Sequence, residues 1–210
     1  MNNKNKYREL QGLSWGTKLA YASGHVYNDL CASIWFSYTL LYFKLSFDDA
    51  TAGLLLLFGQ TTDALATPVI GYLSDKQVGI VQTYGRRKVW HLIGSILVTC
   101  SFPLIFNSCI LCSKNVSFSE KFIYYGLFIG FFQIGWASVQ VAHLSLITDL
   151  SDSSKERVEL NALRQVASVA SSICVYSITL ALLGVEDATL TQADSIVFMV
   201  NYYLLLFICI

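Results

Sequence analysis

Three polar side chains lie close together in an otherwise apolar stretch near the start of the chain. His25 precedes Asn28 by three residues and Asp29 by four, so on a helix all three project from one face. An imidazole, an amide and a carboxylate in a membrane helix can carry a proton, bind a polar solute or bond to a neighbouring helix. Two interpretations are open: these groups hold helices together, or they line a path for a solute or a proton.

A second stretch, from Gln60 to Pro68, repeats this pattern. Asp63 and Thr67 lie four residues apart on one face, and Pro68 frees a backbone carbonyl nearby. Carboxylate and carbonyl oxygens are the groups that a sodium ion or a proton relay would use. We expect Asp63, Thr67 and His25 to take part in proton or cation coupling. The alternative is a structural kink with a hydrogen-bonded Asp63.

Two later stretches add polar stripes at helical spacing. Gln133, Trp136, Gln140 and His143 recur every three or four residues. Further on, Arg164 lies about one turn inside an apolar segment. It either extends to the cytosolic headgroups or faces inward, where its guanidinium would suit a carboxylate of a solute.

A charged connection follows the second stretch, with Asp75 at its start and Arg86, Arg87 and Lys88 at its end. One interpretation is an ordinary basic cytosolic loop. The other is a gate, in which Asp75 pairs with a basic residue or a helix N-terminus in one conformation only.

Composition decides the class of protein. Of 210 residues, 54% are hydrophobic and 13% are charged, and the mean hydropathy is +0.52. A soluble core could not bury so much apolar surface, so we expect an all-α, polytopic membrane protein. A net charge of zero argues against a nucleic-acid partner. Motifs for nucleotide-binding, zinc-protease or serine-hydrolase chemistry do not stand out, so we expect no enzyme, no catalytic residue, no cofactor and no metal site.

Apolar runs of about 20 residues predict the helices. After a cytosolic tail at 1–17, they are expected near 18–45, 51–73, 89–112, 120–147, 160–184 and 195–210. The last run stops in mid-helix, so we interpret the chain as a fragment, or a short product, of a longer protein.

The distribution of basic residues predicts the orientation. Eleven of the 14 Lys and Arg residues lie before the first helix or in the second and fourth connections, which places the N-terminus in the cytosol. The glycosylation signal at Asn115 lies on the opposite side, which agrees. Cys109 and Cys112, on that same side, would be either a disulfide or two buried thiols.

Several stretches carry a family resemblance. "GYLSDKQ" followed by "YGRRK" resembles the signature of the major facilitator superfamily. "DALATPVIGYLSD" and "YGRRKVWHLIG" resemble its glycoside-pentoside-hexuronide cation symporter group, typified by melibiose permease. "GHVYNDLCASIWFSYTLLY", "FQIGWASVQVAHLSLITDL" and "KERVELNALR" are similar to a eukaryotic branch of that group. The likeness covers about Leu13 to Tyr176.

This resemblance implies a transporter of two six-helix halves that works by alternating access, with this chain as the N-terminal half and the C-terminal half absent. It matches Asp29, Asp63 and Arg164 to charged positions that bind sugar and cation in bacterial members. Thr67 and Gln140 stand where that group has two further acids. Losing two carboxylates weakens both a sodium site and a sugar clamp.

The eukaryotic branch is associated with cysteine import into lysosomes and melanosomes, so the resemblance implies that substrate and location. A zwitterion needs one anionic and one cationic contact, which Asp29 and Arg164 would supply. The expected substrate-binding residues are Asp29, Arg164, Gln140, Trp136 and Asn28.

The expected partners are a small solute, membrane lipids, a proton or sodium ion and the missing half. Two alternatives remain. One is a sugar or organic-acid symporter, and the other is a half-length interaction protein that does not transport.

Overall fold

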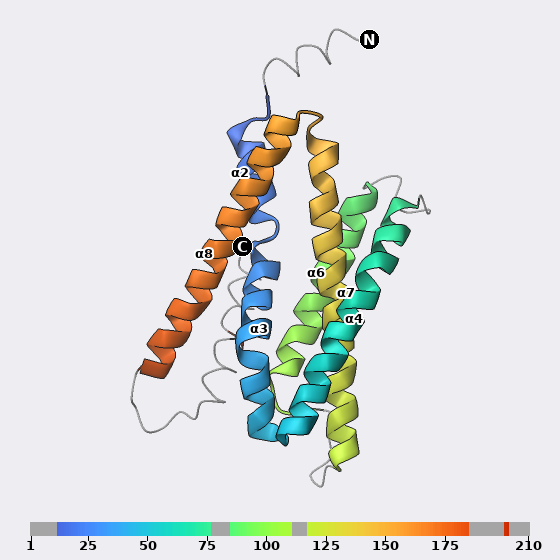
Figure 1. Ribbon diagram of the computed structural model, residues 1–210, viewed down its shortest axis with the longest axis vertical. Coiled ribbons are helices and arrows are strands. Elements are labelled where there is room, and N and C mark those ends of the chain that lie inside the picture. The colour runs from blue at the N-terminus through green and yellow to red at the C-terminus, as the bar shows by residue number, and fades with distance from the viewer. Residues whose placement is uncertain (1–11, 77–84, 111–116, 185–199, 202–210) are drawn as a thin grey trace.

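The computed structural model describes residues 12–76, 85–110, 117–184 and 200–201, and these parts are helical with no strand. Figure 1 shows the helices running along one long axis. The fold class predicted from composition is confirmed. The helices are α2 (Trp15–Ser23), α3 (Val26–Ser46), α4 (Asp49–Asp75), α6 (Arg86–Ile105), α7 (Phe118–Leu150) and α8 (Ser154–Gly184).

Four of the described helices are long and apolar enough to cross a membrane: α4, α6, α7 and α8. Large apolar side chains remain exposed along α4 and α8, including Leu57, Leu65 and Leu180. Such a surface is unfavourable in water and suits lipid or another apolar helix. Further inside, Trp35, Phe43, Phe106 and Phe132 form the buried core between α3, α6 and α7.

The first helix differs from the continuous helix expected at 18–45, because it is divided into α2 and α3. The amide of Gly24 donates to the carbonyls of both Ala20 and Tyr21, as at the end of a helix, and the α3 hydrogen bonds begin with Asp29 N donating to His25 O. Gly24 and His25 therefore form a break between two helices. The break coincides with the polar cluster.

Close backbone contacts set the packing. A Cβ added at Gly94 of α6 would lie 2.6 Å from the carbonyl oxygen of Gly135 of α7, so only glycine fits at this crossing. A Cβ added at Gly59 of α4 would lie 2.8 Å from the Trp35 side chain of α3. On the other side, α8 lies alongside α2 and α3 (Figure 1), and Ser33 Oγ is 2.9 Å from Ser172 Oγ.

Capping residues define where helices begin. Ser14 caps α2, Asp48 caps α4, and Ser117 forms a capping box with Glu120 at the start of α7. Hydrogen bonds from the Thr51 hydroxyl and amide stabilise the Asp48 carboxylate and lower its pKa.

Other boundaries also differ from the expected ranges. The helix expected at 89–112 ends at Ile105, because the Asn107 side chain donates to the Pro103 carbonyl that another helical turn would use. Helix α8 begins at Ser154, six residues before the expected start at 160, and α2 begins within the expected tail at 1–17. The helix expected at 195–210 lies outside the described residues except for 200–201.

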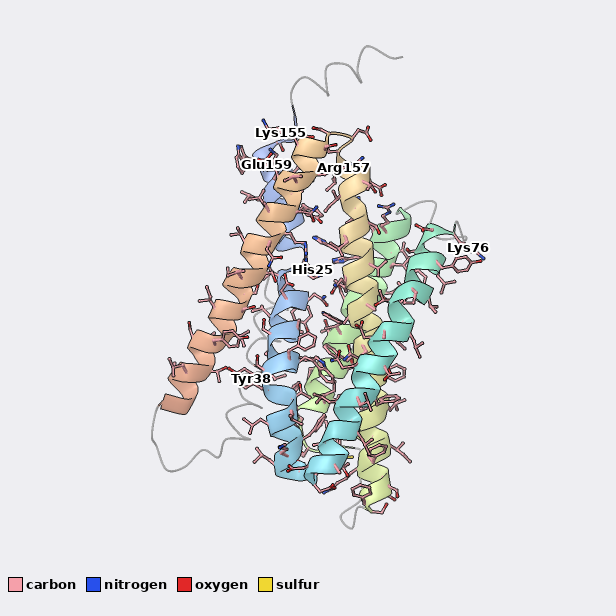
Figure 2. All side chains as sticks on the ribbon, viewed as in Figure 1. His25, Tyr38, Lys76, Lys155, Arg157 and Glu159 are labelled. Atoms are coloured by element: carbon pink, nitrogen blue, oxygen red, sulfur yellow. The ribbon has the colours of Figure 1, made fainter. Side chains whose placement is uncertain are left out.

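Charged side chains gather at one end of the bundle. Figure 2 shows Lys155, Arg157 and Glu159 at the end where α8 begins, with Lys76 beside the end of α4 at about the level of His25. This is the end that the distribution of basic residues places in the cytosol. Buried there, Lys18 of α2 pairs with Glu159 of α8 at 2.8 Å, which joins the two helices.

Candidate functional site

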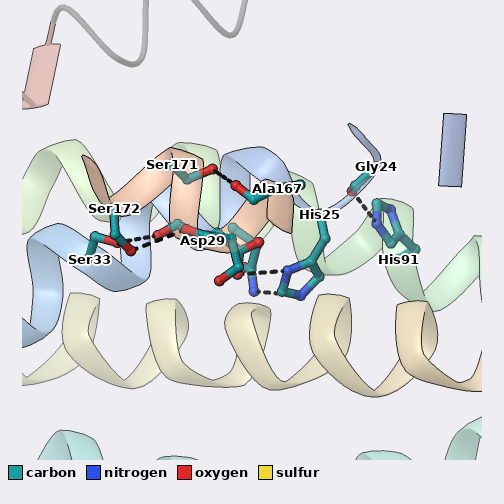
Figure 3. Close-up of polar contacts among 10 residues, drawn as sticks. Gly24, His25, Asp29, Ser33, His91, Ala167, Ser171 and Ser172 are labelled. Atoms are coloured by element: carbon teal, nitrogen blue, oxygen red, sulfur yellow. Dashed lines mark hydrogen bonds and ion pairs between the residues drawn. The ribbon is translucent and has the colours of Figure 1, made fainter. Parts of the chain in front are cut away.

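The polar cluster predicted on the first helix is assembled at its break. His25 Nδ1 lies 3.0 Å from Asp29 Oδ1, and the Asn28 amide nitrogen lies 3.3 Å from His25 Nε2 (Figure 3). All three residues are buried; Asp29 is 8% exposed. Asp29 Oδ2 and Asn28 Oδ1 are buried with no hydrogen-bond partner in the described parts. Unpartnered polar atoms inside a protein are costly, so they mark places for water or a ligand.

The three histidines of the chain converge on this break from different helices. The His143 ring of α7 is centred 5.0 Å from the His25 ring and 5.9 Å from the His91 ring of α6. His91 Nε2 lies 3.1 Å from the Gly24 carbonyl oxygen, which the break leaves outside both helices (Figure 3). The Tyr21 ring stacks on His143 at 4.3 Å, and its hydroxyl donates to the His143 carbonyl oxygen.

A cavity of about 500 Å³ opens beside these rings. Helices α2, α6 and α7 provide its lining, which includes Tyr21, Gly24, Lys88, His91, Ser95 and His143. Most of the cavity surface is apolar.

Arg164 of α8 is the second charged residue of the predicted binding set. It is partly buried, its Nε has no hydrogen-bond partner within residues that the structure describes, and its charge acts on both Tyr21 and His143. Its partly buried environment is compatible with the inward-facing interpretation, which stays an expectation. Within the described residues, Arg164 and Asp29 make no ion pair with each other.

The relative heights of Asp29 and Arg164 follow from the packing of α3 on α8. The two helices run in the same direction and meet at the Ser33–Ser172 hydrogen bond. At 1.5 Å per residue, Asp29 lies about 6 Å above that contact and Arg164 about 12 Å above it. Asp29 and Arg164 are thus offset by about 6 Å along the helix axis, so their opposite charges face the same region without forming an ion pair.

The polar stripe predicted on α7 is also buried. Gln133 is fully buried, and among the described residues neither polar atom of its amide has a hydrogen-bond partner; the same holds for Trp136 Nε1 and His143 Nε2. The Trp136 ring meets Phe36 of α3 edge to face, while Gln140 is partly buried. Helix α7 thus presents several unused donors and acceptors along one face.

The predicted coupling residues on α4 lie apart from this cluster. The Thr67 hydroxyl donates to Asp63 Oδ1 at 3.3 Å, Asp63 is half-buried, and Thr67 is exposed. No described contact joins Asp63 to His25 or Asp29. The structure therefore separates the first-helix cluster from the α4 pair.

One basic residue of the predicted gate, Arg87, has a partner at the end of α7. Arg87 pairs with Asp149 at the end of α7, with Nε 3.3 Å from Oδ2, and donates to the Thr148 hydroxyl at 2.8 Å. Lys88 lines the cavity described above. The Arg86 side chain and Asn115 lie outside the described residues, so the calls on them remain expectations; Asp75 also keeps its predicted role as an expectation.

Sequence reasoning missed three of these residues. Neither His91 nor Asp149 was assigned to the site from the sequence. Only the crossing of α6 with the first helix and with α7 shows their partners. Gly24, just before His25, was a usable signal for the helix break, since glycine favours helix ends. In the described parts, no group of three or more histidine, cysteine or acidic residues is arranged to hold a metal ion.

One of the two cysteines predicted on the non-cytosolic side forms a disulfide. Cys109 is disulfide-bonded, while Cys31, Cys100 and Cys174 are free. A disulfide at this end of α6 suits an oxidising compartment.

A bundle of membrane-spanning helices whose interior carries unpaired polar and charged groups is the architecture of a solute transporter. Comparison with known proteins agrees. Residues 20–210 match the family described as MFS/sugar transport protein, so the chain belongs to this family of the major facilitator superfamily. Members of this family are transport proteins and not enzymes.

Individual relatives narrow the resemblance. The chain is 45% identical over 179 residues to human major facilitator superfamily domain-containing protein 12, an alignment that covers 84% of this chain and 37% of the relative. The horse protein of the same name is 46% identical over 180 residues, covering 85% and 38%. An uncharacterized symporter of Synechocystis sp. is 30% identical over 171 residues, covering 77% and 30%. The chain thus spans less than two fifths of the length of these relatives.

Proposed function

We propose that this chain is the N-terminal half of a secondary transporter that imports cysteine, a small zwitterion, into lysosomes and melanosomes by alternating access. The observation that carries the proposal is the unpaired state of Asp29 Oδ2 and Arg164 Nε, both buried and on helices that pack together. These two buried atoms have no hydrogen-bond partner in the described parts of the chain, so each gains free energy from a ligand group of opposite charge.

The geometry fits a zwitterion better than a single ion. Asp29 offers a carboxylate oxygen to an ammonium group, and Arg164, about 6 Å further along the axis, offers a guanidinium to a carboxylate. An amino acid carries both groups a few ångströms apart. Gln140 and the Trp136 Nε1 of α7 are further polar groups for the rest of the solute.

A sugar or organic-acid cation symporter is the second candidate. The family description names sugar transport, and the Synechocystis relative is named a symporter. Asp63 with Thr67 on α4 would then hold the coupling proton or cation. Against this candidate, Thr67 and Gln140 are neutral where the resemblance implies acids, so cation and sugar would each lose a charged contact.

The third candidate function is that of a half-length interaction protein that does not transport. One six-helix half provides only one wall of a cavity at the centre of such a transporter, so it should not move solute by itself.

The test is uptake of labelled cysteine into proteoliposomes with an acidic or neutral interior. Two proteins are compared: the 210-residue chain alone, and a full-length chimera in which residues 20–199 replace the matching segment of the human relative. Uptake by the chimera only, blocked by unlabelled cysteine and not by melibiose, supports the proposal. Blockage by the sugar instead favours the symporter candidate, and absence of uptake in both favours the non-transporting one.

A further inference from the structure

The break in the first helix gathers every histidine of the chain, which the function proposed above does not require. His25 lies at the break, His91 reaches it from α6 and His143 from α7, and all three rings lie within 6 Å of a neighbour in the set. We infer that these rings form one proton-binding site that holds a single proton, carried on His25. We call the set the histidine site.

Repulsion limits the site to one proton. Two protonated rings centred 5.0 Å apart at an effective dielectric constant of about 20 would make the second proton about a hundredfold less favourable, or more. Two nearby cations also disfavour a second proton. Arg164 of α8 acts on His143, and Lys88 of α6 lines the same cavity as His91 and His143. Tyr21 of α2 is the remaining titratable group that touches the rings.

His25 is the favoured ring because it faces the only carboxylate that the described contacts place against the site. Asp29 Oδ1 lies 3.0 Å from His25 Nδ1, which a protonated ring converts into an ion pair. His91 Nε2 contacts the Gly24 carbonyl oxygen, which can only accept a hydrogen bond. The proton of a neutral His91 therefore lies on Nε2. His143 Nε2 is buried without a partner in the described parts, so a charge there would not be compensated.

Asn28 allows His25 to change its protonation state. In the neutral ring with its hydrogen on Nδ1, Nε2 is free to accept from the Asn28 amide nitrogen 3.3 Å away. When Nε2 gains a proton, a half-turn of the amide brings Asn28 Oδ1 to it as an acceptor. Oδ1 is buried and has no other partner in the part of the chain that the structure describes, so the turn breaks no hydrogen bond seen there. Asn28 therefore acts as a positioning residue for the proton.

The site also touches the proposed function, and this step rests on it. A proton on His25 engages Asp29, the same carboxylate that would receive the ammonium group of the solute. Proton and ammonium then compete, and by linkage each lowers the affinity for the other by the same factor. The geometry thus predicts exchange of a proton for the cationic group at Asp29.

The experiment uses the fact that the chain has three histidines, all in the site. The 210-residue chain is labelled at histidine, placed in lipid nanodiscs and titrated by NMR between about pH 5 and pH 8 without any solute. We expect uptake of one proton per chain, with the largest change on one ring. Three rings that titrate independently, or no protonation in this range, would overturn the inference.

Variants separate the parts of the site. Asp29→Asn should lower the proton affinity of the His25 ring about tenfold, and Asn28→Leu, which removes the acceptor, should lower it several-fold. His143→Gln should alter the titration of His25 because the rings are coupled. Gln60→Leu, on the exposed face of α4, is the matched amide control and should change nothing. Unchanged titration in Asp29→Asn and His143→Gln, with the remaining ring signals still those of a folded chain, would refute a shared site.

The transport function is tested separately from the histidine site. Proton uptake in nanodiscs needs no transport, so it can succeed even if cysteine is not the solute. In the chimera, cysteine uptake that is unaffected by pH while the nanodisc titration holds would reject the competition step. Loss of uptake with an unchanged titration would reject the proposed substrate and leave the histidine site in place.

Discussion

Gly94 of α6 and Gly135 of α7 meet so closely that a Cβ on Gly94 would lie 2.6 Å from the carbonyl oxygen of Gly135. The same Cβ would lie 2.8 Å from the backbone nitrogen of Val139. Backbone atoms cannot rotate away as a side chain can, so the helices would have to separate. This crossing holds α6 at the distance from which His91 reaches the Gly24 carbonyl.

Gly94→Ala is therefore expected to destabilise the chain, by about 1–3 kcal/mol, because it overpacks the crossing. Thermal unfolding in detergent, followed by tryptophan fluorescence, measures the change. Gly71→Ala is the control, since no atom lies within 4 Å of the added methyl group and alanine favours a helix over glycine. An equal effect of the two substitutions would contradict the close crossing.

Glu159→Gln should destabilise the junction of α2 and α8 by about 2 kcal/mol, because it leaves the buried Lys18 ammonium without its counter-ion. This loss of stability is smaller than that expected for a fully buried ion pair, because the Glu159 side chain is 35% exposed. Denaturation of the purified chain checks it. Asp152→Asn, at a fully exposed carboxylate 3.7 Å from Arg157, is the control and should have little effect.

Arg87 and Asp149 should behave as a coupled pair. Their ion pair joins the start of α6 to the end of α7, so a double-mutant cycle with Arg87→Gln and Asp149→Asn should give a coupling of about 0.5–1 kcal/mol. The matched cycle at Lys44 and Asp49, whose side chains are more exposed, should give less. Additive effects at Arg87 and Asp149 would mean that the pair contributes no stability.

Asp29→Asn and Arg164→Gln should each reduce cysteine uptake by the chimera at least about tenfold, because each removes one charged contact of the zwitterion. Arg164→Lys should retain part of the uptake, since it keeps the charge and loses the planar fork. Initial uptake rates, corrected for the amount of protein in the vesicles, provide the measurement. Asp49→Asn, at the exposed start of α4, is the charge control. Full uptake in both binding variants would reject these roles.

Much of the fold followed from hydrophobic patterning. Long apolar runs predicted α4, α7 and α8 because a helix that crosses a bilayer must be apolar over about 20 residues whatever its neighbours are. The end of α6 and the break at Gly24 were not anticipated. Both depend on where individual backbone groups find partners: the Pro103 carbonyl accepts from the Asn107 side chain, and the Gly24 carbonyl faces His91.

The candidate site was predicted in part. His25, Asn28 and Asp29 share a helical face, so their contacts with one another are local and follow from spacing. Whether Arg164 faces inward or extends to the headgroups could not be decided from its position, because one turn inside a helix permits both. His91 and Asp149 carried no local signal, since their partners lie 67 and 62 residues away along the chain.

The sequence by itself determined the all-α membrane class, the family and the polar faces of the helices, since apolar length, motif and side-chain period are local properties. Only the tertiary structure decided that the first helix breaks at Gly24, that Arg87 pairs with Asp149, and that His91 of α6 and His143 of α7 lie beside His25 at the break. Those relationships arise where helices cross, and the crossings depend on the close contacts at Gly59, Gly94 and Gly135, which bring distant parts of the chain together.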